Sequence, residues 1–172
     1  MALKEDIKKA FENNLSKGGS IKDISKSITD AYKKSVELGT DFIGNNWEGI
    51  TYPAIQQSIE SQFNLSYSTR SYLQFNLIEQ ELIKSWSNAS IKLFAIPAPG
   101  MSLVTSGVVV YSTPPGTTPL IEASKGYDNI VNKFYDMFTK HSKSLSFMYI
   151  GLAITGTPPP PISIPVTTFT IK

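Results

Sequence analysis

Residues 93–121 read LFAIPAPGMSLVTSGVVVYSTPPGTTPLI, and these 29 residues contain no Lys, Arg, Asp, Glu or His. A second uncharged stretch, residues 144–171, is 28 residues long and reads SLSFMYIGLAITGTPPPPISIPVTTFTI. Together the two stretches hold ten of the 11 prolines in the chain. A surface exposed to solvent normally carries charges of both signs, which keep a protein soluble and monomeric. We therefore expect other subunits to cover these two stretches.

The remaining sequence is more highly charged, above all in residues 1–40, which carry eight Lys and six Asp or Glu. The net charge of the 172-residue chain is only +2, so it lacks the strongly basic face that is typical of nucleic-acid-binding proteins. The absence of Cys excludes disulfides and thiolate metal sites. Residues 147–154 are the longest apolar run and are shorter than the roughly 20 residues of a membrane span. The charged N-terminus has no apolar signal sequence, so we expect neither secretion nor a membrane partner.

Apolar residues recur at helical spacing in five places. The pattern predicts a helix over residues 3–17 and a second one that begins after the N-cap Ser20 and ends at Gly39. These two helices form a hairpin over residues 1–39. The pattern also predicts a helix from Pro53, a break at residues 64–68, a helix over 69–88 and a last helix over 127–143.

Strand-like segments occupy residues 90–96, 108–111, 146–154 and 162–171. We therefore predict an α+β fold, in which the helical hairpin and the helices of residues 53–88 pack on a small antiparallel β-sheet. Residues 1–156 would form one domain, with mixed strand and helix over 90–156. Residues 157–172 would form an extended, Pro-rich C-terminal arm, since four consecutive prolines favour polyproline II. The order of helix, strand, Pro-rich break and strand occurs twice, which leaves an internal duplication open beside an ordinary α+β domain.

The candidate interface residues lie in the two uncharged stretches, where strands could pair with the sheet edge of a neighbouring subunit. They are Val108, Val109, Val110, Tyr111, Ile162, Ile164, Val166, Phe169 and Ile171.

No catalytic, cofactor-binding or metal-ligating residue is predicted. His141, the one histidine, lies in the last turn of a predicted helix, where a positive charge suits the helix terminus. Glu48, Glu79 and Asp136 are the carboxylates that an unusual acidic active site would use, and they form no recognisable motif. Glu79 and Glu81 are two residues apart on a helix and therefore point to different faces. We expect a protein that is not an enzyme and needs no cofactor or small-molecule substrate.

The chain opens with Met-Ala-Leu, has short amphipathic helices, and ends in a Gly/Thr/Pro-rich tail with Thr155-Gly156-Thr157 and the final residues TTFTIK. In this it resembles small virion structural proteins of tailed bacteriophages, mainly over residues 127–172. The resemblance is one of composition, and no functional residue is transferred from it. It implies a subunit of a capsid, neck, tail or baseplate, assembled in the host cytoplasm.

The sequence thus predicts a non-enzymatic structural or assembly component of a virus particle. It would act through packing between subunits and through strand addition, and its partners would be other copies of itself and other virion proteins. The alternative is a soluble adaptor module that binds a protein through an apolar groove. A stable monomer over a wide concentration range would favour the adaptor.

Overall fold

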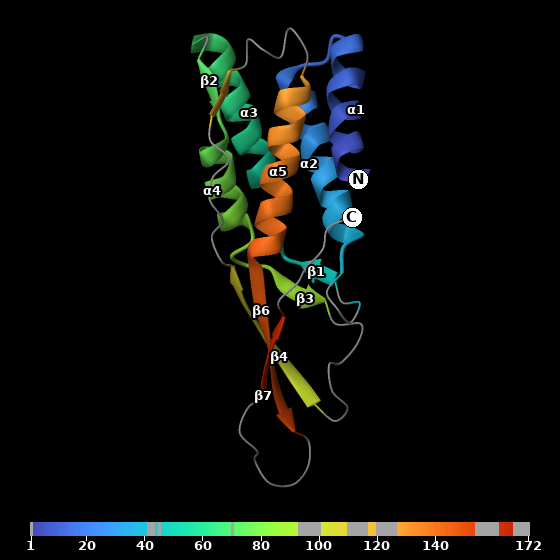
Figure 1. The fold of residues 1–172 in the computed structure, drawn as a ribbon, viewed down its shortest axis with the longest axis vertical. Coiled ribbons are helices and arrows are strands. Elements are labelled where there is room, and N and C mark those ends of the chain that lie inside the picture. The colour runs from blue at the N-terminus through green and yellow to red at the C-terminus, as the bar shows by residue number, and fades with distance from the viewer. Residues whose placement is uncertain are drawn as a thin grey trace.

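Five helices in the described part of the chain run side by side in the computed structural model and form a bundle at one end of an elongated molecule (Figure 1). The structure describes residues 2–40, 44, 46–69, 71–92, 101–109, 117–119, 127–153 and 162–166. The helices are α1 (Ala2–Ser16), α2 (Ile21–Glu37), α3 (Tyr52–Thr69), α4 (Phe75–Ser85) and α5 (Asp128–Ser144). The strands are β1 (Asn46–Glu48), β2 (Tyr72–Gln74), β3 (Ser90–Lys92), β4 (Met101–Val109), β5 (Thr117–Pro119), β6 (Leu145–Ala153) and β7 (Ile162–Val166).

The hairpin of α1 and α2 forms as the sequence predicts. The Ser20 side chain accepts a hydrogen bond from the backbone N–H of Asp23, and the Asp23 carboxylate accepts one from the Ser20 backbone N–H. This reciprocal capping box satisfies two backbone donors at the start of α2 that the helix itself leaves unbonded. Gly18, with φ of 65°, makes the left-handed turn between the two helices at little steric cost.

Aromatic side chains of four helices fill the core of the bundle. The Phe134 ring on α5 lies 4.9 Å from the Phe75 ring on α4 and 6.1 Å from the Phe63 ring on α3, measured between ring centroids. Tyr32 on α2 stacks on Phe138 of α5 at 4.2 Å. All five side chains are buried, so the apolar stripes of these helices face one another.

The strands pair in three separate antiparallel sheets. β1 pairs with β3, β2 pairs with β5, and the largest sheet has the order β4-β6-β7. β6 follows α5 without a loop, and the three-stranded sheet extends beyond the end of the bundle (Figure 1). The helices therefore lie end to end with this sheet.

The predicted α+β fold, with helices packed on an antiparallel sheet, is therefore wrong. The body of the molecule is helical, and its helices pack on one another. The sequence analysis identified the apolar helix faces but assigned them the wrong partner. Once Phe134, Phe138 and the other buried residues of α5 contact helices, that helix has no remaining apolar face for a sheet to cover.

Part of the predicted C-terminal arm is also wrong. Residues 162–166 form β7, which pairs with β6 of the same chain, so this segment folds back. Residues 157–161 and 167–172 lie outside the described residues. The predicted break at residues 64–68 is wrong too, because α3 continues to Thr69 and buries Ser66 there.

Candidate functional site

The predicted interface residues fall on the two outer strands of one sheet. Val108 and Val109 belong to β4, and Ile162, Ile164 and Val166 belong to β7. β6 lies between the two strands, so β4 and β7 form the two opposite edges of the same sheet. Four predicted residues lie outside the described part of the chain: Val110, Tyr111, Phe169 and Ile171.

A proline fixes the hydrogen-bonding pattern at the β7 edge. In an antiparallel ladder, residue pairs that exchange backbone hydrogen bonds alternate with pairs that do not. Pro165 has no N–H and lies opposite Met148, so these two residues form a pair that does not exchange backbone hydrogen bonds. The neighbouring pair of Ile164 and Tyr149 therefore does exchange backbone hydrogen bonds. The outer edge of β7 therefore consists of the backbone groups of Ser163 and Pro165, and Pro165 provides no donor to a further strand.

The same alternation identifies the backbone groups on the outer edge of β4. Tyr149 directs its N–H and C=O toward β7, so its pair with Thr105 on the other side is not hydrogen-bonded. Thr105 therefore directs its N–H and C=O away from β6, as do Leu103 and Gly107 two residues away on each side. Among the strands that the structure describes, none pairs with this side of β4.

Within the described residues 101–109, β4 carries no charge, proline or bulge, which are features that commonly prevent strand addition. Natural edge strands are commonly protected by charged residues, by proline, by bulges or by being short. β4 has nine residues, MSLVTSGVV, with neither charge nor proline. Its pairing with β6 continues over all nine residues without a bulge. Within the described residues the two outer strands of this sheet thus differ, since β7 contains a proline and β4 contains none.

The residues considered for catalysis do not form a shared site in the described part of the chain. Glu48 on β1 and Asp136 on α5 are exposed, whereas Glu79 on α4 is fully buried. Among the described residues there is no group of three or more His, Asp or Glu that could hold a metal ion. None of the described helices has the length and apolar character needed to cross a membrane.

His141 differs from its prediction as a charged residue at a helix end. It is fully buried, and its ring centroid lies 5.7 Å from that of Trp86. Burial lowers the pKa of His141 from 6.5 to about 4, because the charged imidazolium would lose its hydration. His141 is therefore a neutral core residue at neutral pH.

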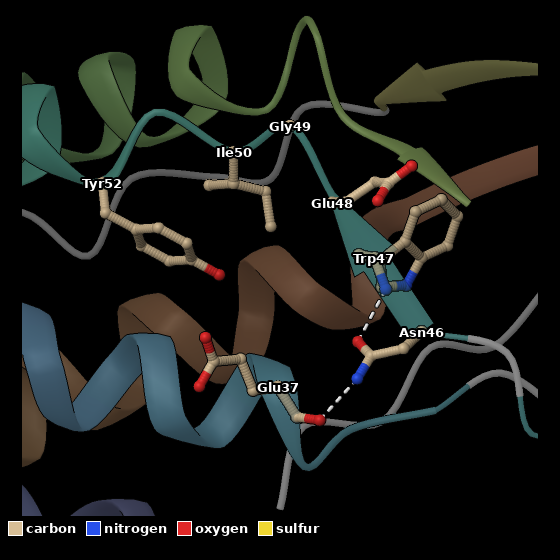
Figure 2. A pocket seen from close by; sticks show the side chains of 7 residues that line it. All are labelled: Glu37, Asn46, Trp47, Glu48, Gly49, Ile50 and Tyr52. Atoms are coloured by element: carbon tan, nitrogen blue, oxygen red, sulfur yellow. Dashed lines mark hydrogen bonds between the residues drawn. The ribbon is translucent and has the colours of Figure 1, made fainter. Parts of the chain in front are cut away.

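A pocket of about 380 Å³ lies where the end of α2 meets β1 and the start of α3 (Figure 2). Its lining residues are Glu37, Asn46, Trp47, Glu48, Gly49, Ile50 and Tyr52. The sequence analysis did not identify this pocket. Trp47 anchors the pocket to the core, since it is 6% exposed and its ring lies 6.1 Å from that of Trp86.

Gly49 shapes this pocket, and we expect its replacement to destabilise the protein. Its φ is 82°, and a Cβ atom there would lie 2.5 Å from the Asn88 backbone oxygen. We expect Gly49→Ala to lower the unfolding free energy by about 2 kcal/mol or more, since the left-handed backbone alone costs an alanine about 1–2 kcal/mol. Gly44→Ala is the matched control, because its φ is 91° and a Cβ there would meet nothing within 4 Å. Equal losses in urea unfolding would contradict the proposed clash with Asn88.

Comparisons of this chain with protein-family models, with curated proteins and with solved structures find no match.

Proposed function

We propose that this protein is a non-enzymatic assembly subunit, and that two copies associate through the outer edges of their β4 strands. The observation that carries the proposal is the outer edge of β4, which is uncharged and pairs with no other strand that the structure describes. Its outward N–H and C=O groups, at Leu103, Thr105 and Gly107, can form a ladder with a second strand. When β4 pairs with itself in antiparallel orientation, no like charges oppose one another, since the strand carries none.

The difference between the two edges favours a closed assembly over an open fibre. If both outer strands could pair, sheets would add to one another without limit. Because Pro165 interrupts the donors of the β7 edge, β4 is the one outer strand of the described three-stranded sheet that keeps all its outward donors. The pairing of two such edges uses both, and it ends at a two-fold dimer. Larger assemblies would then use other surfaces of the dimer.

We further propose that the dimer is a component of a virus particle, as the resemblance to small phage virion proteins suggests. In this setting the other uncharged segments would contact neighbouring copies and other virion proteins.

A pair of proline substitutions in adjacent residues tests the proposed edge. Thr105→Pro removes a donor that faces away from β6, so the chain's own sheet should persist. We expect the dissociation constant of the dimer to rise at least ten-fold, because the partner strand loses a hydrogen bond and clashes with the proline ring. Analytical ultracentrifugation measures the dissociation constant, and circular dichroism shows whether the fold is retained.

Ser106→Pro is the matched control for this experiment. The Ser106 N–H faces β6, in the pair with Met148, so proline there disrupts the internal sheet. It should reduce the strand signal in circular dichroism, whereas Thr105→Pro should leave it unchanged. A Thr105→Pro protein that keeps its fold and dimerises like the unmodified chain would contradict the proposed interface. Deletion of residues 157–172 is a poorer test, because removal of β7 would uncover a second edge on β6.

The adaptor function remains a second candidate because one end of the bundle exposes large apolar side chains. Leu65 and Tyr67 on α3 and Tyr72 on β2 are 47%, 72% and 59% exposed. Exposed apolar residues that lie near one another often mark a protein-binding surface. A monomeric protein that captures a partner through these residues would support the adaptor in place of the assembly subunit.

A further inference from the structure

We propose that the two-fold axis of the β4 dimer passes through Thr105, so that the two copies of this residue lie directly opposite one another. The joint sheet then has the strand order β7-β6-β4-β4-β6-β7, and the two helix bundles lie at its opposite ends. This inference rests on the proposed function and adds to it the register and the shape of the dimer.

The outward backbone groups of β4 restrict where a two-fold axis can lie. These groups belong to alternate residues of the strand, Met101, Leu103, Thr105, Gly107 and Val109. A two-fold axis makes the pairing self-complementary, so a residue that opposes a second one is opposed by it in return. Hydrogen bonds form only where an outward residue of one copy opposes an outward residue of the other. The axis therefore passes through a residue and not between two residues.

The length of β4 selects Thr105 among the possible positions of the axis. Thr105 is the middle residue of the nine-residue strand. With the axis there, Leu103 opposes Gly107 of the second copy, and Met101 opposes Val109, so every described residue of β4 has a partner. A shift of the axis by one residue leaves one end of each strand without a partner in β4 and removes hydrogen bonds from the ladder. Within the described strand, the register centred on Thr105 thus forms the most hydrogen bonds.

The direction of β4 determines where the second helix bundle lies. Val109 pairs with Leu145, which directly follows α5, so this end of β4 lies at the bundle. Met101 pairs with Ala153 at the end of the sheet that is far from the bundle (Figure 1). Antiparallel pairing places Val109 of the second copy beside Met101. The second bundle is therefore at the far end of the joint sheet, and the dimer is longer than a single chain.

Cross-linking of single cysteines under mild oxidation tests the register, since the unmodified chain contains no cysteine. In the proposed register the Cα atoms of the two Thr105 residues lie about 5.5 Å apart, within the range of about 4.4–6.8 Å that a disulfide spans. We expect most of the Thr105→Cys protein to become a covalent dimer. Circular dichroism of the reduced protein shows whether the fold is retained.

Leu103→Cys and Gly107→Cys are the matched controls in the same strand. The two copies of Leu103 are four residues apart along the proposed ladder, about 14 Å, and the same holds for Gly107. Neither variant should cross-link to itself, whereas a mixture of the two should give a covalent heterodimer. A non-covalent dimer in which Leu103→Cys or Gly107→Cys links to itself would overturn the register and leave the β4 interface standing. A dimer with no cross-link in any of these combinations would overturn the β4 interface as well.

Small-angle X-ray scattering of the unmodified dimer tests the placement of the bundles. The Thr105→Pro protein provides the reference for a single chain. We expect the maximum dimension of the dimer to be clearly greater than that of the single chain. A dimer no longer than one chain would place the bundles side by side and overturn the proposed shape.

Discussion

Replacing Phe134 with alanine is expected to lower the free energy of unfolding by about 4 kcal/mol, within the range for removal of a buried phenylalanine. The Phe134 side chain is 0% exposed, and its ring contacts the rings of Phe63, Phe75 and Phe138 at 6.1, 4.9 and 6.0 Å. The substitution removes apolar surface from the junction of α3, α4 and α5 and leaves a cavity that a tightly packed bundle fills only in part.

Tyr67→Ala is the matched control, since it also truncates an aromatic side chain within a helix of the bundle. Tyr67 is 72% exposed, so its loss should change the unfolding free energy by no more than about 0.5 kcal/mol. Urea unfolding followed by circular dichroism measures both values. Similar, small losses for the two variants would mean that α5 does not pack between α3 and α4 as described.

Lowering the pH from about 6.5 to about 4 is expected to reduce the free energy of unfolding by about 3 kcal/mol through the titration of His141 alone. In the unfolded chain His141 binds a proton near its ordinary pKa of 6.5, whereas in the folded protein burial lowers that pKa to about 4. Between these two values the unfolded state binds a proton that the folded state lacks, so the equilibrium shifts toward unfolding as the pH falls. Below both values the two states are protonated alike, and this contribution no longer changes.

The His141→Leu variant isolates this effect from the titration of carboxylates, which continues in both proteins. The unfolding free energy of the unmodified chain should fall more steeply than that of the variant between pH 6.5 and pH 4. The measurement is urea unfolding at half-unit pH intervals. Parallel curves for the two proteins would show that His141 titrates normally in the fold and is not enclosed by the core.

Local sequence signals predicted α1, α2 and α5 to within one or two residues, because the causes of these helices are local, whereas the break at 64–68 and a helix start at residue 69 were wrong. Ser20 and Asp23 have the spacing of a capping box, and the structure contains that box. The apolar face of α5 was also predictable, yet His141 was misread. It lies seven residues after Phe134 and therefore continues the same buried stripe, a signal that the residue type obscured.

The hydrophobic pattern could not predict how the helices and strands are arranged, because that arrangement depends on contacts between residues far apart in the sequence. An amphipathic helix buries its apolar face against either a helix or a sheet, and the sequence pattern is the same in both cases. The protective role of Pro165 required the register that places it opposite Met148. Similarly, the pocket combines Glu37 from α2 with Glu48 and Tyr52 from later segments, and no sequence motif links the three.

The mass of the intact chain, measured by light scattering over a wide range of concentration, tests the central claim most directly. The account predicts a concentration-dependent change from the 18.9 kDa chain to twice that mass, with no growth beyond it through the β4 edge. A protein with intact helix and strand signals that keeps the mass of a single chain at every concentration would contradict it.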